Sequence, residues 1–388
     1  MGLMPIPGRR VRRTRATVTA ALGVATLVSA TLVGSSAYAT PGTRAHVRVL
    51  APGVALTTTF DRRVPLRTYV LWIDPSQGAS IGMAMAHGGL GSLQKTSDMA
   101  REAGALAAVN GDLGSAISAR PVHPFALDGE LVQTSPVLGA MFSISSDGSM
   151  RIGRPDQSVS VTQMSTDETW SIATWNHGRP TPGEITAHTD IGGTAEAPRP
   201  FTCSARLLPS GPSTATDDGS ARTYTVDQTG CLTGRLQPDG GVVLSAVPTT
   251  EESTFIRSLS LGEEMRIDWS LGWAGLTDGI GGSHILVQDG VNALHSCSGA
   301  ICSRNPRTAI GLMPDGRIVL VVVDGRQHGS VGMSLAELAS LFLQLGATSA
   351  MNLDGGGSSA MAIKGQVVND PSDGFERAVT NAILIDAG

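Results

Sequence analysis

Ten Asp-Gly dipeptides are spread along this 388-residue chain, and they constrain its fold more than any other feature. Asp-Gly suits tight hairpin turns, because glycine accepts a positive φ and aspartate tolerates one. Apolar, β-rich runs such as residues 241–247 and 285–288 flank many of these dipeptides. We therefore expect most of the chain to form β-sheet.

Two segments carry helical signals. Residues 93–103 precede Gly104, which is typical of a helix end. In the second segment Ser334 and Glu337 form a capping box, and apolar residues recur at helical spacing as far as Leu345. Gly346 is expected to terminate this second helix. The sequence thus predicts few helices in a β-rich chain.

The runs around the second helix indicate a topology. Residues 307–312 and 317–323 flank a turn and predict a hairpin, and residues 318–323 are continuously apolar, as in a strand buried on both faces. The helix would then return the chain to a strand at 349–353, making a βαβ unit with parallel strands. The expected fold class is α+β or mixed α/β, a β-rich mixed sheet with this unit near the C-terminus.

Polar residues follow the ends of these strands. Asp324 and Asp354 would end the two parallel strands, and Arg307 would begin the strand antiparallel to the first. A strand leaving this edge would turn at 364–365 and return to deliver Asn369. Sheets of this type bind ligands beyond the carboxyl ends of their parallel strands. We expect these polar corners to converge on a site.

The N-terminus reads as an export signal. Five arginines between positions 9 and 15 precede an uncharged stretch that closes with Ala37-Tyr38-Ala39, so residues 1–39 are interpreted as a secretory signal peptide, with an uncleaved membrane helix as the alternative. Removing them leaves 23 basic and 33 acidic residues, a net charge near −10. This charge argues against nucleic acid as a partner. No later apolar run reaches the roughly 18 residues that a membrane span needs, so we expect a secreted protein without stable membrane insertion after cleavage.

Four cysteines in an exported chain favour two disulfides with three possible pairings, of which we prefer Cys203–Cys231 and Cys297–Cys302. A zinc site is a poor alternative, because the cysteines lack CxxC spacing and no histidine stands at ligand spacing. The stretch at about 156–240 is rich in Pro, Thr, Ser and Gly. We interpret it as a β-rich insertion or rim within one domain over residues 40–388.

The C-terminal motifs resemble the phosphodiester glycosidase family. The resemblance covers about residues 45–388 and is densest in residues 304–311, 323–327, 332–335, 352–359, 369–372 and 376–377, with an upstream match at 108–112. Leu113 stands where a large aromatic residue usually follows the upstream corner. The resemblance implies hydrolysis of a sugar-1-phosphodiester at its glycosidic carbon, which releases a free sugar, N-acetylglucosamine-like, and a phosphomonoester. A secreted member would act on a cell-wall or exopolysaccharide phosphoglycan.

Such a reaction requires different residue types at the phosphate and at the anomeric carbon. Arginine pairs with phosphate oxygens, and a carboxylate stabilises the oxocarbenium-like carbon or attacks it. The catalytic candidates are Asp354 first, as nucleophile or base, followed by Asp324, Asp112 and His328. The phosphate-binding candidates are Arg307, Arg377 and Arg326, with the backbone N–H groups of Gly355, Gly356 and Gly357. The candidates for binding sugar hydroxyls are Asn110, Asn352 and Asn369.

Two other classes of function remain open. The chain could be a non-catalytic binder of wall phosphoglycans, or a phosphodiesterase that attacks phosphorus, which would require a two-metal cluster of carboxylates and histidines that is not evident. Ser358 and Ser359 lack the elbow of a serine hydrolase, and the glycine run lacks the ending of a P-loop. No cofactor is indicated with certainty, and a divalent cation near the phosphate remains an open question.

Overall fold

The computed structural model describes residues 43–388 apart from residues 116, 193–201, 217–218, 232–234 and 295–296. The predicted signal peptide, residues 1–39, lies outside this part of the chain. Within it there are three α-helices, α1 (Thr96–Ala103), α2 (Glu251–Ser258) and α3 (Leu335–Leu345). None of its helices is long and apolar enough to cross a membrane.

The largest layer is an eight-stranded sheet. In spatial order its strands are β1 (Thr43–Ala51), β2 (Val54–Asp61), β3 (Leu66–Ile73), β23 (Ile318–Val323), β22 (Arg307–Leu312), β24 (Ser349–Asn352), β20 (His284–Gln288) and β21 (Val291–Asn292). Every residue of β23 is buried, because this strand has neighbours on both sides and layers on both faces. At the other extreme, β1 is an edge strand whose residues are mostly exposed.

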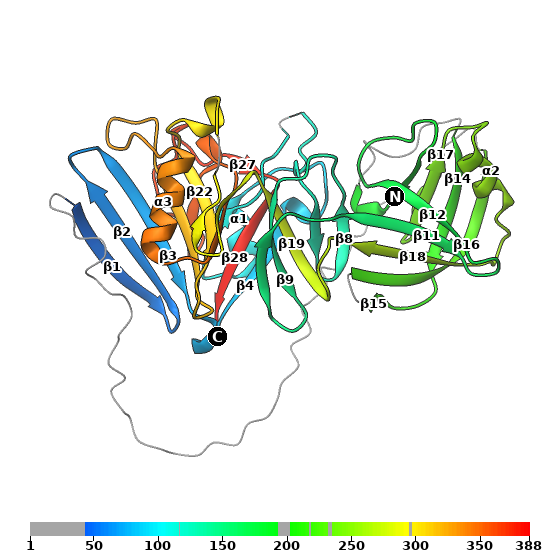
Figure 1. Ribbon diagram of the computed structural model, residues 1–388, viewed down its shortest axis with the longest axis horizontal. Helices are drawn as coiled ribbons and strands as arrows, with labels where there is room; N and C mark the ends of the chain where they lie inside the picture. The colour runs from blue at the N-terminus through cyan, green and yellow to red at the C-terminus, as the bar shows by residue number, and fades with distance from the viewer. Residues whose placement is uncertain (1–42, 116, 193–201, 217–218, 232–234, 295–296) are drawn as a thin grey trace, which may run out of the picture. The chain divides into compact units, whose positions relative to one another are not determined.

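A five-stranded sheet faces one side of this layer. Its order is β26 (Gln366–Val367), β25 (Met361–Ile363), β6 (Ala107–Asn110), β28 (Asn381–Ala387) and β4 (Ala79–Met85). Leu71, Leu320, Val109 and Ile383 join in one core between the two sheets. The opposite face of the large sheet packs against α3 in a second core, and α1 packs on the five-stranded sheet in a third. Figure 1 shows α3 against the strands of the large sheet. The layers therefore run α3, large sheet, five-stranded sheet, α1.

The predicted βαβ unit is wrong, and the mixed α/β class with it. Strands β23 and β24 do flank α3, but β22 lies between them and pairs antiparallel with both. The predicted hairpin is confirmed, since Arg307 pairs with Val323 and Leu312 with Ile318. Among the described strand pairs, only β12 and β13 run parallel. The fold is a β-rich, nearly all-antiparallel structure, and the expectation of few helices holds.

Two smaller sheets complete this part of the structure. One has the order β10 (Met150–Gly153), β9 (Ala140–Ser145), β19 (Leu276–Gly282), β7 (Phe125–Leu127) and β8 (Glu130–Gln133). The other pairs β27 (Ala378–Val379) with β5 (Gln94–Lys95). Phe125 and Phe142 extend from the first of these sheets into the main core.

The remaining strands form a closed barrel. Seven strands follow one another around it: β14 (Cys203–Pro209), β17 (Val242–Ala246), β13 (Ile185–His188), β12 (Glu168–Trp175), β11 (Ser158–Gln163), β18 (Glu264–Ser270) and β16 (Gly219–Cys231), and β16 pairs again with β14. The short β15 (Thr214–Ala215) pairs with the outer part of β16. The stretch predicted at about 156–240 lies largely in these strands, and its status as an insertion stays a prediction.

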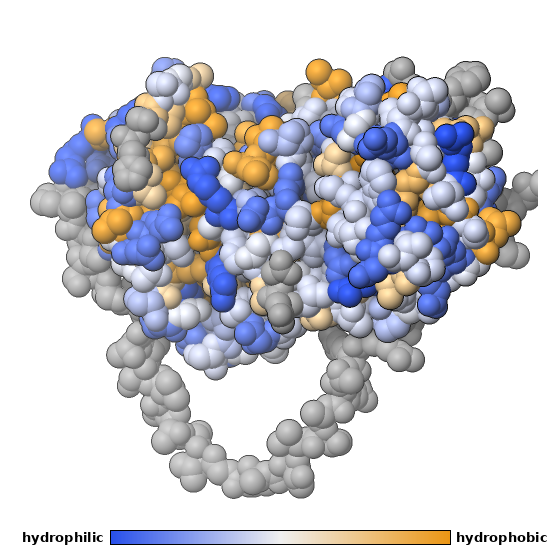
Figure 2. Space-filling view, turned by 45° about the vertical axis from the view of Figure 1, so that its right-hand side comes forward, coloured by the Kyte–Doolittle hydropathy of each residue, from blue (hydrophilic) through white to orange (hydrophobic). Residues whose placement is uncertain are grey.

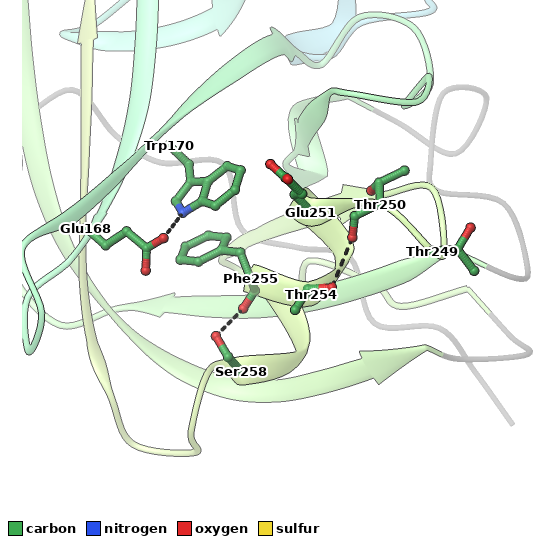
Figure 3. Close-up of a pocket in the computed structure, with 8 residues that line it drawn as sticks. All are labelled: Glu168, Trp170, Thr249, Thr250, Glu251, Thr254, Phe255 and Ser258. Atoms are coloured by element: carbon green, nitrogen blue, oxygen red, sulfur yellow. Dashed lines mark hydrogen bonds between the residues drawn. The ribbon is translucent and has the colours of Figure 1, made fainter.

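Helix α2 packs on this barrel. Trp170 of β12 stacks on Phe255 of α2 with ring centroids 5.1 Å apart, and Glu168 accepts a hydrogen bond from the indole. Figure 3 shows these side chains beside Glu251 and Thr254. Together they line a hollow of about 500 Å³. Over the face drawn in Figure 2, hydrophilic and apolar residues are interspersed.

Both preferred disulfides are present. Cys203 and Cys231 occupy paired positions on β14 and β16, so this bond joins two strands at the barrel closure. Cys297 and Cys302 close a short loop just before β22.

Candidate functional site

Asn110 joins three of the polar corners. It is the last residue of the buried strand β6, and its amide nitrogen donates to the carbonyl of Asp354 at 2.9 Å. Its amide oxygen accepts from the hydroxyl of Thr308 at 2.7 Å and from the N–H of Ala360 at 3.1 Å. The N–H of Asp354 in turn donates to Gly111 at 2.9 Å. Asn110 is fully buried, so the structure places this predicted sugar ligand inside the scaffold that positions Asp354.

The Asp354 carboxyl lies at the start of the glycine loop. Its Oδ1 accepts the N–H of Gly355 at 2.8 Å. Burial raises the pKa of this carboxyl to about 6, and the negative charge of Asp112 adds to the increase. The Ser358 hydroxyl, the Gly355 N–H and the positive charge of Arg377 pull the pKa the other way. Asp354 is therefore an ionised base near neutral pH that can also take up a proton under mildly acidic conditions.

Two arginines lie against the glycine loop. A Cβ added to Gly356 would stand 3.2 Å from Nη1 of Arg326, and one added to Gly357 would stand 2.2 Å from Nη2 of Arg377. Gly357 must be glycine because the Arg377 guanidinium and the Asp373 carboxylate occupy the space that a side chain would fill, whereas Arg326 would crowd a side chain at Gly356. Gly356 also has a φ of +62°, which favours glycine.

Each of these arginines is held in place. Arg326 has a φ of +59°, an uncommon conformation for a residue with a side chain, and it donates to Oδ1 of Asn305 at 2.9 Å. Arg377 donates to Asp373 at 2.6 Å. The preceding Glu376 accepts the N–H of Ser97 at 2.7 Å, which fastens the Arg377 loop to α1. Both side chains remain open to solvent.

Arg307, the first predicted phosphate ligand, is buried and already well bonded. Its guanidinium donates to the carbonyls of Met333, Ile301 and Ser303 at 2.9, 2.6 and 2.5 Å. Burial, and then the positive charge of Arg326, lower its pKa to about 10, which leaves it protonated at neutral pH. In this structure Arg307 ties the start of β22 to the disulfide-closed loop, and it adds positive charge behind the site.

A buried pair that sequence reasoning missed lies next to Asp354. Nδ1 of His123 is 2.6 Å from Oδ1 of Asp112, and the His123 N–H donates to the other carboxylate oxygen at 2.9 Å. The N–H of Asp112 donates to Asn381 at 2.8 Å. Gly139 and Gly281 leave the room that the imidazole occupies. Asp112 was predicted as a carboxylate candidate, but His123 carries no sequence motif that could have indicated its partner.

His284 is a second histidine that the sequence did not single out. It begins β20 opposite Asn352. Burial lowers its pKa, and the positive charges of Arg307, Arg154 and His123 lower it further. The imidazole is therefore neutral at neutral pH, and its buried Nδ1 forms no hydrogen bond within the described chain.

Asp324 belongs to a different group from Asp354. Its Oδ1 accepts from the amide of Asn369 at 3.1 Å and from the N–H of Asp370 at 3.0 Å. Burial raises the pKa of the Asp324 carboxyl. Burial also raises the pKa of Tyr69, to about 12, and the negative charge of Asp324 contributes to this increase. Asn369 also accepts from the N–H of Met361 at 2.8 Å and donates to the carbonyl of Ser359. The predicted pair Asp324 and Asn369 thus supports the far end of the glycine loop.

The last two predicted residues lie apart from the carboxylates. Asn352 is buried and donates to the hydroxyl of Ser283 at 2.9 Å, with no partner for its amide oxygen among the described residues. His328 is exposed at the tip of a turn between Gln327 and Ser330. The structure shows no contact between His328 and Asp354 or Asp112 in the part of the chain that it describes.

No group of three or more His, Cys, Asp or Glu residues stands at metal-binding geometry within the described ranges. The site that the structure brings together therefore contains Asp354 on a glycine loop, Arg326 and Arg377 beside it, the Asp112–His123 pair, and His284. A carboxylate adjoining a glycine loop that two arginines contact fits a substrate with an anionic group next to the atom that reacts.

The chain is similar to a known family. Residues 215–386 match the sequence model of the phosphodiester glycosidases. This stretch contains the glycine loop and both arginines, so the match supports the resemblance that the sequence motifs indicated. It also supports a glycosidase-type, hydrolytic function.

Individual relatives match over short segments. The chain is 46% identical over 82 residues to the SPbeta prophage-derived uncharacterized protein YomE of Bacillus subtilis, which is 21% of this chain and 13% of that protein. It is 42% identical over 67 residues to the N-acetylglucosamine-1-phosphodiester alpha-N-acetylglucosaminidase of Bos taurus, which is 17% of this chain and 12% of that protein. The matches thus span about an eighth of the length of these relatives.

The fold recurs in a solved structure. A hypothetical protein from Synechocystis superposes with a TM-score of 0.67 at 20% identity, over 87% of this chain and 62% of that one. This likeness concerns the fold alone.

Proposed function

We propose that the protein is a secreted glycosidase that hydrolyses a sugar-1-phosphodiester at the anomeric carbon. The observation that carries the proposal is the position of the Asp354 carboxylate at the start of a glycine loop that Arg326 and Arg377 flank. The family match and the name of the bovine relative support a sugar phosphodiester as the substrate class.

The reaction places opposite charges on its two halves. As the bond between C1 and the phosphate oxygen breaks, its electron pair leaves with the phosphate, and the sugar becomes oxocarbenium-like. Arginine N–H groups stabilise the departing anion, each charged hydrogen bond contributing roughly 1.5–3 kcal/mol. Water supplies the new hydroxyl at C1 and the proton that the reaction releases. The phosphate leaves as a stable anion, so one carboxylate and the arginines suffice in this scheme.

Asp354 acts on the sugar side, as nucleophile or as the base that activates water. Its raised pKa keeps it ionised above about pH 6, which is the form that both roles need. The Asp112–His123 pair lies near enough for the charge of Asp112 to act on Asp354. We assign it a positioning role, with His284 as a neutral hydrogen-bonding group near His123.

The natural substrate in this proposal is a cell-wall or exopolysaccharide phosphoglycan with an N-acetylglucosamine-like sugar at the cleaved bond. The predicted signal peptide and the two disulfides support an extracellular site of action, because disulfides persist in oxidising compartments.

A product assay tests the proposal. The purified chain would be incubated with an N-acetylglucosamine-1-phosphodiester, and the products would be identified by mass. Free sugar and a phosphomonoester are expected from the wild type, with loss of turnover in Asp354→Asn. The substitution His328→Ala, at the exposed turn, serves as a matched control and should keep activity.

Two results would contradict the proposal. Sugar-1-phosphate as product would show attack at phosphorus and would favour a phosphodiesterase. Absence of turnover across a panel of sugars, with retained sugar binding, would favour a non-catalytic binder of wall phosphoglycans.

A further inference from the structure

A cationic groove lies along the N-terminal edge of the large sheet. His46 and Arg48 of β1, Arg67 and Tyr69 of β3, and Val368 line a hollow of about 470 Å³. Arg44 lies on the same face by register, because alternate residues of a strand share a face. No acidic side chain lines this groove.

Basic side chains form an ordered row. Arg44, His46 and Arg48 stand at alternate positions of β1, so neighbours along the row are separated by about 7 Å. None of the three forms an ion pair or a side-chain hydrogen bond in the part of the chain that the structure describes. Two strands away, Arg67 lies over the ring of Phe60 at 5.8 Å and completes the positive face.

This row is unusual in a chain with an excess of acidic residues. The sequence contains 33 acidic and 28 basic residues, and several arginines elsewhere in the described chain have a carboxylate partner, such as Arg206 with Asp227 and Arg317 with Asp315. A row of basic side chains without carboxylate partners on an open strand attracts a polyanion whose charges repeat along its length.

The groove is connected to the proposed catalytic loop. The N–H of Asp324 donates to the carbonyl of Arg67 at 3.1 Å, and Val368 immediately precedes Asn369. Asn369 joins Asp324 to the backbone of Ser359, which follows the glycine loop. The groove is therefore joined through buried hydrogen bonds to the residues that support the far end of the glycine loop.

We infer that this groove binds the continuing chain of a polymeric substrate in which phosphodiesters repeat. A three-carbon polyol between two phosphates spans a length comparable to the spacing of the basic side chains on β1, so successive phosphates can meet successive side chains. The inference rests on the proposed function only in that the proposed function identifies which bond of the bound polymer is cleaved. Binding in the groove itself does not depend on turnover.

The test uses poly(glycerol phosphate) of about ten units as the probe, with affinity measured by calorimetry on the full chain in low and moderate salt. Arg48→Glu should weaken binding about tenfold, as expected for one lost charge-assisted contact. A plot of log affinity against log salt concentration should also become less steep, by about 0.7 for each phosphate contact that the variant loses. Arg257→Glu on α2 changes net charge equally and should bind as the wild type does.

Three results would overturn the inference. Equal weakening in both variants would show that only net charge matters, and equal affinity for poly-glutamate would show that phosphate is not recognised. An absence of polymer binding would leave the β1 charges with the ordinary role of preventing edge-to-edge pairing. Turnover of a small diester without polymer binding would refute the groove alone. Polymer binding without turnover of any sugar-1-phosphodiester would refute the proposed function alone.

Discussion

Asp354→Asn should make the protein inactive and more stable. The pKa of this carboxyl rises from 3.8 to about 6 in the folded protein, so folding disfavours its ionised form. At pH 7.5, the difference of about two pKa units corresponds to a cost of about 3 kcal/mol. Asparagine keeps an oxygen to accept the Gly355 N–H but carries no charge. The substitution therefore removes the cost while it removes the catalytic group.

The stability difference between the variant and the wild type depends on pH, because the Asp354 carboxyl has different pKa values in the folded and unfolded states. Between pH 3.8 and about 6 the folded state binds more protons at this carboxyl than the unfolded state does, so the wild type loses stability as pH rises through this window. At pH 5 the remaining cost is about 1.6 kcal/mol. The advantage of the variant should thus be roughly half as large at pH 5 as at pH 7.5.

Differential scanning calorimetry measures this effect. For roughly 350 residues unfolding together, 3 kcal/mol corresponds to an increase in Tm of about 4 °C at pH 7.5, and about 2 °C is expected at pH 5. Asp289→Asn, at an exposed turn, is a matched control with little expected change. A Tm of the Asp354→Asn variant equal to or below that of the wild type at pH 7.5, or a gain that is independent of pH, would refute the reasoning.

Three further predictions concern the same site. In the wild type, kcat/KM for a sugar-1-phosphodiester should fall about tenfold per pH unit below about pH 6, because Asp354 becomes protonated; a flat profile down to pH 4 would exclude it as base or nucleophile. His123→Ala should lower stability by about 3 kcal/mol in thermal unfolding, because Asp112 loses its partner while still buried, whereas Asp112→Asn combined with His123→Ala should recover part of the loss. Gly357→Ala should lower kcat/KM at least about tenfold, the scale of one lost charged contact, by displacing Arg377; Gly329→Ala, whose Cβ would meet nothing within 4 Å, should be neutral, and equal effects of the two would contradict this.

Local signals in the sequence predicted individual elements well. The capping box of Ser334 and Glu337 and the terminating Gly346 define α3 as expected. The turn at Lys364 and Gly365 joins β25 to β26, with φ values of +52° and +70°. These features depend on residues within a few positions of one another, so the sequence contains the information that is needed.

The order of strands depends on distant residues. The sequence gives no sign that β23 pairs with β3, which is about 250 positions earlier, or that β24 pairs with β20. Once β22 stands between β23 and β24, the expected parallel pair cannot form. Continuous apolar composition indicates only that a strand is buried, and it leaves its neighbours undetermined.

Some residues of the candidate site were also marked by local sequence signals, and others were not. Asp354, the glycine loop and Asn110 lie together, because each follows a strand end that the sequence marks with polar residues. His123 and His284 approach the site from segments without such marks. Arg307 has the residue type of a phosphate ligand, but only the structure reveals the three carbonyls that occupy its guanidinium.

The barrel begins and ends at neighbouring strands. Ser158, at the start of β11, pairs with Ser270, at the end of β18, so the chain enters and leaves the barrel at the same place. Such a module can be exchanged, enlarged or lost during evolution with little disturbance to the rest of the chain, because the gap that it leaves is short. The loops of the candidate site lie outside residues 158–270. Relatives with the same glycine loop can therefore carry different modules at this position, and substrate preference can evolve separately from the chemistry of bond cleavage.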